Sequence, residues 1–372
     1  MMQMRICFLA DIRSIHTKRW IDFFVPNNEI HLITLNFSPD EMGNVCLDDY
    51  IKSGVKIHIL PKTFPGILLN TLRVRNLVRR IQPDLLHAHF VTHYGYWGAR
   101  TGFHPFIVSG WGDDVLIHPK KPGLSYLVKY ALQCADLITC DGENSFQAIM
   151  HLGIAREKIH LITHGVDTRK FSPDVCDPGL LPGLFGNTWP VVTCIRGFKP
   201  IYDPETVIRA IPLALVSTPE INFLVAGKGY EENRMRKLAD DLGVSRRIFF
   251  CGPIPHEKLP PYLASSDVYL SASLSDGGVA VSTFEAMASG LPVIVTDVGD
   301  NRLWVHNNKN GFIVPVHQPA QIAEKIAYLI RNPGFREASG RTNRVLVEEK
   351  QDYNKEMEKV HRLYRDLAEV RE

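Results

Sequence analysis

The sequence predicts an α/β protein with two Rossmann-like, doubly wound domains, and three observations support this prediction. The chain has 372 residues, which is too many for one ordinary hydrophobic core. Short apolar, β-branched runs alternate with helical patterns, and repeated βα units of this kind form a parallel sheet covered by helices. Residues 171–190 interrupt the alternation, because they are dense in proline and glycine, as interdomain linkers are.

The first half of the chain contains seven predicted strands. Several are apolar on both faces, as expected of buried parallel strands. The strands are RICFLAD, EIHLITL, VKIHIL, LLHAHF, FIVSGW, LITCDG and IHLITHG. Helical patterns such as LLNTLRVRNLVRRI and LSYLVKYALQCA lie between them. We therefore expect an N-terminal Rossmann-like domain over residues 1–170.

A second series of βα units follows the linker and predicts a C-terminal Rossmann-like domain over residues 191–350. Its predicted strands are VVTCI, INFLVAG, RIFFCG, VYLSAS, PVIVTD and GFIVPV. Its predicted helices include residues 204–216, 230–242 and 319–331. Residues 351–372 place apolar side chains at helical spacing, so we expect a final amphipathic helix, with a return to the N-terminal domain as one option.

Composition and net charge favour some classes of protein over others. The chain is 45% hydrophobic and 22% charged, as soluble globular proteins are, and its net charge of +2 is too small to predict binding to nucleic acid. Its seven cysteines form no CxxC pair, which favours a reduced cytoplasmic compartment. The start, MMQMRICFLAD, is read as a strand rather than a signal peptide, and no apolar stretch approaches the roughly 20 residues of a membrane span.

The segment SDGGVAVSTFEAMASGLP, residues 275–292, has the composition of an anion site. Gly277 and Gly278 would let the backbone approach a ligand closely, and the free N–H groups of the following helix start favour a diphosphate. Glu285 lies one turn into that helix, where a carboxylate can accept hydrogen bonds from two neighbouring ribose hydroxyls. The alternatives are a simple tight turn for the glycines and a solvent-facing helix position for Glu285.

This segment resembles the donor-binding signature of the family 4 retaining glycosyltransferases, which have the two-domain GT-B fold with a central cleft. In that signature an acid is followed by seven residues and then by glutamate, and FEAMASGLPVIVTDVG matches its second half. Here Gly277 stands eight positions before Glu285, and the acid Asp276 stands nine before it. The resemblance implies that Asp276 and the turn of Gly277, Gly278, Val279 and Ala280 address the sugar, and that Glu285 holds the ribose.

IRGFKPIYDPETVIRA resembles the family segment in which an arginine at a strand end and a following lysine hold the donor diphosphate. Arg196 stands at the arginine position, and Ile201 replaces the usual lysine, so Lys199 is the candidate substitute, with Tyr202 as the alternative occupant. Independently of the resemblance, the planar fork of arginine matches phosphate oxygens and stabilises the charge that develops on a leaving diphosphate. A surface arginine at a strand end is the alternative reading.

Further matches extend the resemblance across nearly the whole chain. FLVAGKGYEENRMRKLA resembles the segment that packs under the nucleotide, which gives Gly227 a binding role. GPIPHEKLPPYLASSDVYLSAS resembles the loop beside the nucleobase, with Ile254 as the neighbour of the base. HGVDTRKFSP resembles the segment that closes the first domain, with His164 in place of the usual asparagine.

Two segments of the first half resemble parts of the family's acceptor side. In HPFIVSGWGDDV, Trp111 replaces the usual histidine of the turn at the cleft and Asp114 matches its aspartate. Trp111 would stack on a sugar or form a wall, with core packing as the alternative, and helix capping is the alternative for Asp114. In QPDLLHAHF the resemblance implies cleft-lining histidines, His87 and His89. Core packing, or zinc binding together with His93, are the alternatives, although no acid or cysteine joins them at ligand spacing.

Two further segments of the first half are the turn after the first predicted strand, which differs from the family pattern, and an arginine-rich helix, which allows two interpretations. LADIRSIHTKRW lacks the Gly-Gly pair of many family members, so the resemblance implies a reshaped sugar pocket rather than a loss of activity. The predicted helix LRVRNLVRRI gathers four arginines, which form a solvated face or, as the alternative, a membrane-facing one. These arginines are Arg73, Arg75, Arg79 and Arg80.

The resemblance implies a retaining glycosyltransferase of the hexosyltransferase type, as in polysaccharide biosynthesis, and we expect it to be cytoplasmic. The donor is a nucleoside-diphosphate sugar, with UDP favoured and GDP as the alternative, and the acceptor is a glycan, a lipid-linked molecule or a small molecule. The resemblance implies front-face substitution without a metal or a tightly bound cofactor, and contact with the inner membrane face is an open option. The predicted catalytic residues are Arg196, Lys199, Asp276, Glu285 and Asp114. The predicted donor-binding residues are Arg196, Lys199, Gly227, Ile254, Gly277, Gly278, Val279, Ala280 and Glu285.

Two rival classes share this scaffold. A sugar-nucleotide epimerase would need additional acid and base carboxylates in the cleft, which the sequence does not assign. A non-catalytic nucleotide-sugar-binding protein is supported by the altered spacing before Glu285 and by the missing lysine at position 201. A dehydrogenase is disfavoured, because no GxGxxG follows the first strand.

Overall fold

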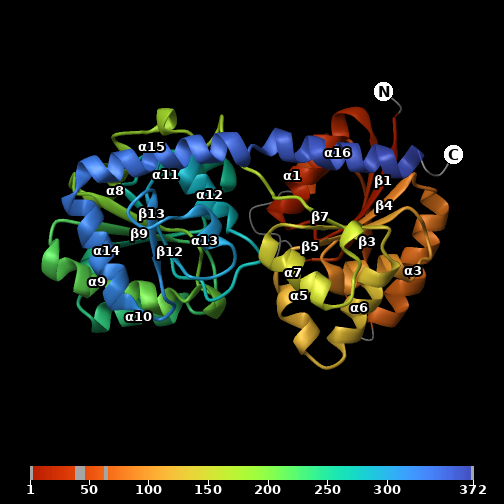
Figure 1. The fold of residues 1–372 in the computed structure, drawn as a ribbon, viewed down its shortest axis with the longest axis horizontal. Coiled ribbons are helices and arrows are strands. Elements are labelled where there is room, and N and C mark those ends of the chain that lie inside the picture. The colour runs from red at the N-terminus through yellow and green to blue at the C-terminus, as the bar shows by residue number, and fades with distance from the viewer. Residues whose placement is uncertain (1–2, 38–46, 63–65, 370–372) are drawn as a thin grey trace. The chain divides into compact units, whose positions relative to one another are not determined.

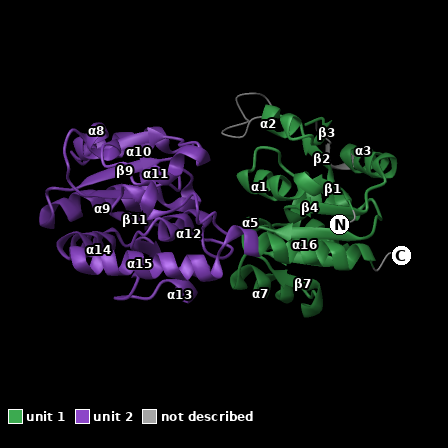
Figure 2. Cartoon of the chain, turned by 90° about the horizontal axis from the view of Figure 1, so that it is seen from above, with its two compact units in different colours: residues 1–164, 356–372 green, residues 165–355 purple. Residues whose placement is uncertain are grey.

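The computed structural model describes residues 3–37, 47–62 and 66–369. The chain divides into two compact units (Figures 1 and 2). Unit 1 consists of Met1–His164 together with Glu356–Glu372, and unit 2 consists of Gly165–Lys355. Each unit is built around its own parallel sheet, so each is described by itself.

Unit 1 has a seven-stranded parallel sheet in the order β3-β2-β1-β4-β5-β6-β7. Its central strands are buried along their whole length, in agreement with their apolar sequences on both faces. The strands are β1 (Arg5–Leu9), β2 (Glu29–Leu35), β3 (Lys56–Leu60), β4 (Leu85–His89), β5 (Phe106–Gly110), β6 (Leu137–Cys140) and β7 (Ile159–Leu161). The strand order reverses between β1 and β4, and ligands of open α/β sheets bind beyond the carboxyl ends of strands at such a point.

Helices connect the strands of unit 1 (Figure 1). The side chain of Ser14 accepts a hydrogen bond from the Thr17 amide and so caps the first helix directly after β1. A π-helical turn, Val91–Gly95, follows β4. The helices are α1 (Ile15–Phe24), α2 (Leu47–Lys52), α3 (Gly66–Ile81), α4 (Tyr96–Ala99), α5 (Asp113–Leu116), α6 (Leu124–Cys134) and α7 (Glu143–His151).

The last helix, α16 (Tyr353–Glu369), adds a covering layer to unit 1 with its residues from Glu356 onward. Tyr364 stacks on Phe24 of α1 with ring centroids 4.7 Å apart, and its hydroxyl hydrogen-bonds the Nδ1 of His87 in β4. Met357 and Val360, which lie two turns and one turn earlier, are also buried. The apolar stripe identified in the sequence is therefore the stripe that packs on unit 1.

Unit 2 has a six-stranded parallel sheet in the order β10-β9-β8-β11-β12-β13. The order reverses between β8 and β11, which are paired. The strands are β8 (Val191–Cys194), β9 (Asn222–Ala226), β10 (Ile248–Gly252), β11 (Val268–Ser271), β12 (Val293–Thr296) and β13 (Gly311–Val314). These strands coincide with the six apolar runs identified in the second half of the sequence.

Two hydrophobic clusters cover the sheet of unit 2, as a doubly wound sheet requires. The first cluster includes apolar residues of α9 (Pro204–Ser217), α10 (Glu232–Asp241) and α14 (Pro319–Arg331). The second includes residues of α11 (Leu259–Ala264), α12 (Val281–Ala288) and α15 (Pro333–Lys350). The remaining helices of the unit are α8 (Leu180–Phe185) and α13 (Asn301–Trp304). Helix α15 was not among the helices identified from sequence.

The Pro- and Gly-rich segment 171–190 lies within unit 2. It contains α8, and Leu181 of that helix packs with Val191 and Leu224. The chain enters and leaves unit 2 at neighbouring places, since the Val166 amide donates to the Gln351 carbonyl at 2.7 Å and the Tyr353 amide donates to the Val166 carbonyl at 3.0 Å. Across the described residues, no helix combines the length and the apolar character that a bilayer crossing needs.

Candidate functional site

Two of the predicted site residues, Arg196 and Asp276, lie where the strand order of unit 2 reverses. Arg196 follows β8 by two residues, and Ser273 and Asp276 follow β11. Because β8 and β11 are parallel neighbours, their carboxyl ends lie at the same edge of the sheet and bring these loops together. Arg196 and Asp276, which come from two distant segments of the sequence, therefore meet at one place in unit 2.

The guanidinium of Arg196 is held by three side chains. Its Nη2 contacts the Oδ1 of Asp276 at 2.6 Å, and its Nε donates to the Ser273 hydroxyl at 3.1 Å. The ring of Tyr202 lies 4.4 Å from the guanidinium carbon. The Arg196 and Asp276 side chains are only 13% and 14% exposed. Burial opposes the charge of Arg196, but Asp276 and the nearby tyrosines favour it enough to keep its pKa above the usual value.

The turn after β11 is packed against the turn after β12. The Asp300 amide donates to the carbonyl of Gly278 at 3.1 Å. Gly299 has a left-handed φ of +53°, and a Cβ there would collide with the Gly278 carbonyl, so only glycine fits this approach. Gly277 and Gly278 are buried, and Val279 and Ala280 lead into α12, whose N-cap residue Ala280 makes no side-chain cap. Sequence reasoning missed Gly299, although a glycine directly after a strand-end turn was a usable signal.

Glu285 lies inside unit 2 and not toward solvent, so the solvent-facing alternative is wrong. It is 4% exposed, and its Oε1 lies 2.7 Å from the Nε2 of His256. His256 begins a short 3₁₀ turn after β10, and its ring lies 5.3 Å from that of Phe171. Sequence reasoning missed His256, because nothing in the spacing of the two residues indicates that they meet. Glu285 is thus a charged position on an otherwise small and apolar helix, and its partner comes from a separate turn.

The other predicted donor residues occupy three different environments. Gly227 has a φ of +125° and lies so close to Gly197 that a Cβ would collide with its Cα atom, so this glycine joins the loops after β8 and β9. Ile254 is partly buried and packs against the cluster that contains α12. Lys199 is exposed at the start of the turn Pro200–Tyr202. None of these placements tests a contact with the donor, which stays a prediction for all three.

Asp114 of unit 1 is fully buried and bonded to the backbone. Its carboxylate accepts hydrogen bonds from the amides of Val91 at 2.7 Å and Trp111 at 2.9 Å. Burial raises the pKa of Asp114 to about 6, although these hydrogen bonds act in the opposite direction. The contacts make Asp114 an anchor of the turn that carries Trp111, and a contact with substrate stays a prediction.

The histidines after Leu85 lie among aromatic rings. His87 is bonded at both ring nitrogens, to the Ser109 hydroxyl at 2.7 Å and to the Tyr364 hydroxyl, which leaves no nitrogen for a metal and contradicts the zinc alternative. Burial lowers the pKa of His87 to about 3 and that of His89 well below its usual value. The ring of Trp111 lies 4.7 Å from that of His89 and 5.8 Å from that of His16. Trp111 is partly buried, since it packs on these histidines and also lines a pocket, and a contact with a sugar stays a prediction.

The pocket beside Trp111 has a volume of about 430 Å³ and belongs to unit 1. It lies beyond the carboxyl ends of β1, β2, β3, β4 and β5. Its lining includes Asp11, Arg13, Phe37, Lys62, His89 and Trp111. It is thus the counterpart, in unit 1, of the edge at which Arg196 and Asp276 meet in unit 2.

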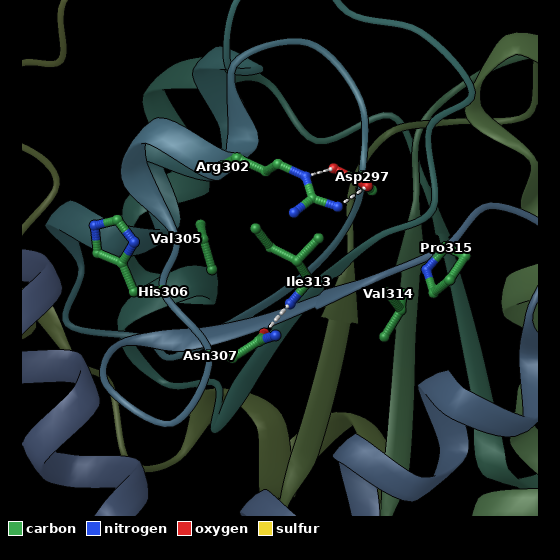
Figure 3. Close-up of a pocket in the computed structure, with 8 residues that line it drawn as sticks. All are labelled: Asp297, Arg302, Val305, His306, Asn307, Ile313, Val314 and Pro315. Atoms are coloured by element: carbon green, nitrogen blue, oxygen red, sulfur yellow. Dashed lines mark hydrogen bonds and ion pairs between the residues drawn. The ribbon is translucent and has the colours of Figure 1, made fainter.

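A smaller pocket, of about 370 Å³, belongs to unit 2 and contains none of the predicted site residues (Figure 3). It lies beside β13 and α13, where Asp297 and Arg302 form an ion pair and Asn307 accepts from the Ile313 amide at 2.7 Å. The Arg302 side chain is largely exposed, so solvent weakens this pair.

Comparison with known proteins identifies related sequences in both halves of the chain. Residues 184–345 match the family model described as "Glycosyl transferases group 1". Residues 5–142 match the model described as "Glycosyl transferase 4-like". The two matches fall in unit 2 and unit 1, respectively.

Curated relatives are similar over parts of the chain. A phosphatidylinositol N-acetylglucosaminyltransferase component of Arabidopsis thaliana is 24% identical over 311 residues, which are 75% of this chain and 66% of that protein. A GDP-mannose-dependent alpha-(1-6)-phosphatidylinositol monomannoside mannosyltransferase of Mycolicibacterium smegmatis is 29% identical over 183 residues, which are 47% of this chain and 48% of that protein. The chain thus spans about half to two thirds of the length of these relatives.

A solved structure matches nearly the whole chain. Anabaena HepE in complex with UDP and glucose superimposes with a TM-score of 0.82, covering 98% of this chain and 100% of that one at 17% identity. At this identity the likeness concerns the fold, and it confirms the predicted GT-B class with two Rossmann-like units.

Proposed function

Since this chain belongs to the group 1 family of glycosyltransferases, we propose that it is a retaining glycosyltransferase that uses a nucleoside-diphosphate sugar. The observation that carries the proposal is the contact of the Arg196 guanidinium with Asp276, the acid of the glycine turn that leads into the helix of the buried Glu285. The transferred group is a hexose, and the acceptor is a glycan, a lipid-linked molecule or a small molecule.

Arg196 is proposed to bind the donor diphosphate. Ser273 and Tyr202 hold its guanidinium in place, so little side-chain freedom is lost when phosphate oxygens bind. As the bond from the sugar to the diphosphate breaks, negative charge grows on the leaving oxygens, and a positioned cation stabilises that charge more than the ground state. Lys199 is exposed beside the same turn and would add a second, more mobile charge.

Glu285 is proposed to bind the ribose of the donor. Its carboxylate has four lone-pair directions, of which His256 occupies one at Oε1. The others can accept the two ribose hydroxyls, and burial makes each such bond stronger than it would be in water. Ile254, partly buried near the same cluster, would contact the nucleobase.

Asp276 and the turn of residues 277–280 are proposed to address the sugar. In the front-face substitution that the family implies, the acceptor oxygen bonds to the anomeric carbon on the face from which the diphosphate leaves. The acceptor proton passes to the departing phosphate oxygen, so no protein base is needed and the configuration is retained. Asp276 would position the sugar hydroxyls, while the amides at the start of α12 stabilise the negative charge.

The relatives suggest the range of donors and acceptors. One relative is named as GDP-mannose-dependent, and the similar Anabaena structure holds UDP and glucose. UDP is proposed first and GDP second. Both curated relatives are named for phosphatidylinositol substrates, which favours a lipid acceptor and a cytoplasmic protein at the inner membrane face. In α3, exposed Leu69 and Leu72 accompany the arginines, which suits contact with an anionic bilayer.

The test is a panel of UDP-, GDP- and ADP-sugars incubated with the protein, with and without glycan and lipid acceptors. Transfer, or slow hydrolysis of one donor, is the expected result, and NMR of the product should show the anomeric configuration of the donor. A new isomer of the sugar nucleotide would identify an epimerase instead. Nucleotide binding without turnover of any donor would identify a non-catalytic protein, so either outcome would contradict the proposal.

Arg196→Ala tests the site within the same panel. Loss of a charge-assisted contact is worth roughly 1.5–3 kcal/mol, so affinity for the preferred nucleoside diphosphate should fall about 10- to 100-fold by calorimetry. Because this change leaves Asp276 without its cation, Arg196→Lys serves as the folding control and should retain part of the affinity. Unchanged affinity in Arg196→Ala would place the diphosphate elsewhere.

A further inference from the structure

The pocket of about 430 Å³ in unit 1 carries two cations around one aromatic ring. The guanidinium carbon of Arg13 lies 3.6 Å from the centroid of the Phe37 ring, and the Nζ of Lys62 lies 5.1 Å from the same centroid. Arg13 follows β1, Phe37 follows β2 and Lys62 follows β3, so three adjacent parallel strands bring these side chains to one place.

Arg13 is held in a defined orientation. Asp11 accepts from the Arg13 amide at 2.9 Å, from its Nε at 3.0 Å and from its Nη2 at 2.7 Å. Phe37 supports the flat face of the same guanidinium. A guanidinium fixed by one carboxylate and one ring loses little conformational entropy when it binds a ligand, in contrast to an extended surface arginine.

The described residues that line the pocket carry a net positive charge. Among the described residues that line it, Arg13 and Lys62 outnumber the one carboxylate, Asp11. His89 adds no charge, because burial keeps its pKa well below the usual range. An oxyanion beside Phe37 would therefore meet a net attraction, and its partial removal from water would strengthen that attraction.

The part of the pocket lining that contains His89 and Trp111 suits a ligand ring that carries hydroxyl groups. The Nε2 of His89 is buried without a hydrogen-bond partner among the described residues, and its Nδ1 lies 3.4 Å from the Thr17 hydroxyl. A neutral imidazole with one unsatisfied nitrogen can bind a hydroxyl group. Trp111 lies beside His89 in the same lining and offers an aromatic surface to a sugar ring.

We propose that the unit 1 pocket binds an acceptor that carries an oxyanion, phosphate or carboxylate, next to a hydroxyl-bearing ring. Arg13 and Lys62 hold the oxyanion, while His89 and Trp111 contact the ring. The inference rests on the proposed transferase function, since it names the class of acceptor, but its first readout is binding and needs no turnover. The oxyanion comes from a soluble sugar phosphate or uronate, or from the phosphate of a lipid.

The first experiment measures binding by calorimetry to glucose 6-phosphate, glucuronate and glucose. The two anions should bind about tenfold or more tightly than glucose, and Arg13→Gln and Lys62→Gln should each remove most of that preference. Sedimentation with phosphatidylglycerol vesicles, compared with phosphatidylcholine vesicles, tests the lipid source, and the same two variants should reduce the anionic preference. Equal binding of all three sugars together with equal sedimentation with both lipids would overturn the proposal.

Two control variants separate this pocket from general surface charge. Arg156 also stands over a phenylalanine ring, that of Phe146 at 5.3 Å, but lies outside the pocket, so Arg156→Gln matches Arg13→Gln. Lys129→Gln, at an exposed position of α6, matches Lys62→Gln. Both controls should keep the preference for anions. If they lose it to the same extent as the pocket variants, the attraction is one of net charge and the proposal fails.

A third measurement, the affinity for a nucleoside diphosphate, separates this inference from the transferase proposal. Affinity for UDP or GDP should be unchanged in Arg13→Gln and Lys62→Gln, because the proposed nucleotide residues lie in unit 2. Loss of anion preference with intact nucleotide binding supports the acceptor pocket. Intact nucleotide turnover without any anion preference in the wild type would overturn only the acceptor class.

Discussion

At the residue scale, the buried polar side chains of this protein differ in how many of their hydrogen-bonding atoms already have a partner in the protein. His87 has both ring nitrogens bonded, whereas the Glu285 carboxylate meets His256 at one of its two oxygens. Asp114 has a backbone amide at each oxygen. A side chain with satisfied atoms supports its surroundings, and one with remaining acceptor capacity can bind a ligand. This difference makes Glu285 the stronger candidate for a substrate contact.

If Glu285 binds the ribose, replacing Glu285 with alanine should remove the affinity that the two ribose hydroxyls contribute. We expect the wild type to bind UDP about tenfold more tightly than 2′,3′-dideoxy-UDP, since hydrogen bonds to a charged acceptor are worth roughly 1.5–3 kcal/mol. Glu285→Ala should bind the two ligands equally. Calorimetry with both ligands measures the difference, and a Glu285→Ala protein that still prefers UDP would refute the assignment.

Because the pKa of Asp114 is raised in the folded protein, its contribution to the free energy of unfolding should depend on pH. Its pKa is raised from 3.8 to about 6 in the folded protein, so folding favours the protonated form. The stabilisation from this group is fully present below the unfolded pKa and is lost as the pH rises through about 6. Relative to Asp114→Asn, the wild type should lose about 2.5 kcal/mol of unfolding free energy between about pH 4 and pH 7. Urea denaturation at several pH values measures this, and a constant difference would contradict it.

At the element scale, the loops after the strands of unit 2 are held together by close backbone contacts. Gly197 has a φ of +80°, and a Cβ there would lie 2.7 Å from the Lys228 carbonyl oxygen. Gly227 and Gly299 make similar approaches in the neighbouring loops. The contacts of Gly197 and Gly227 join the loops after β8 and β9, and the contact of Gly299 joins the loops after β11 and β12. The loops that carry Arg196 and Asp276 are therefore positioned by backbone packing as well as by side chains.

Gly197→Ala should test this support, with Gly243→Ala as its control. Gly243 has a similar φ of +70° but open space around the position of a Cβ. The control should cost about 1 kcal/mol for the left-handed backbone alone, and Gly197→Ala should cost more, because the contact adds to the strain. Only Gly197→Ala should also weaken nucleotide binding. Equal losses of stability by denaturant unfolding would show that the contact has no energetic role.

The elements were predictable from sequence to the extent that each depends on local pattern. Helices α9, α10 and α14 match the ranges expected from apolar periodicity, and the six strands of unit 2 match apolar runs. Helix α15 was missed because its first half is polar and glycine-containing, and its apolar residues pack in the two clusters that contain α12 and α14. The pairing of His256 with Glu285 depends on the packing of α11, which follows the His256 turn, against α12, and no local pattern encodes that contact.

At the scale of the whole molecule, the chain returns to unit 1 after completing unit 2. The packing of α16 on α1 and β4 makes the stability of unit 1 depend on residues that are far away in the sequence. Family motifs identified the sheet edges that carry the candidate sites. They could not identify Arg13 and Lys62 as the charged residues of the unit 1 pocket. Arg13, Phe37 and Lys62 each lie on a different loop, and they match no motif.

Met357→Ala should therefore destabilise unit 1 and leave unit 2 intact. Met357 is fully buried, and truncation of such a side chain costs roughly 2–5 kcal/mol. Hydrogen exchange should accelerate in β1, β4 and α1, while the nucleotide response of unit 2 stays unchanged. Arg365→Ala, an exposed position on the same helix, is the control and should change neither. Faster exchange confined to unit 2 would contradict the assignment of α16 to unit 1.

The Arg196–Asp276 pair has a consequence for how affinity responds to salt. If Arg196 binds the donor diphosphate as proposed, the incoming anion competes with Asp276, an anion already built into the protein, so the guanidinium exchanges one counterion for another. The affinity gained from Arg196 should then vary little with ionic strength, since added salt screens the outgoing and the incoming partner alike.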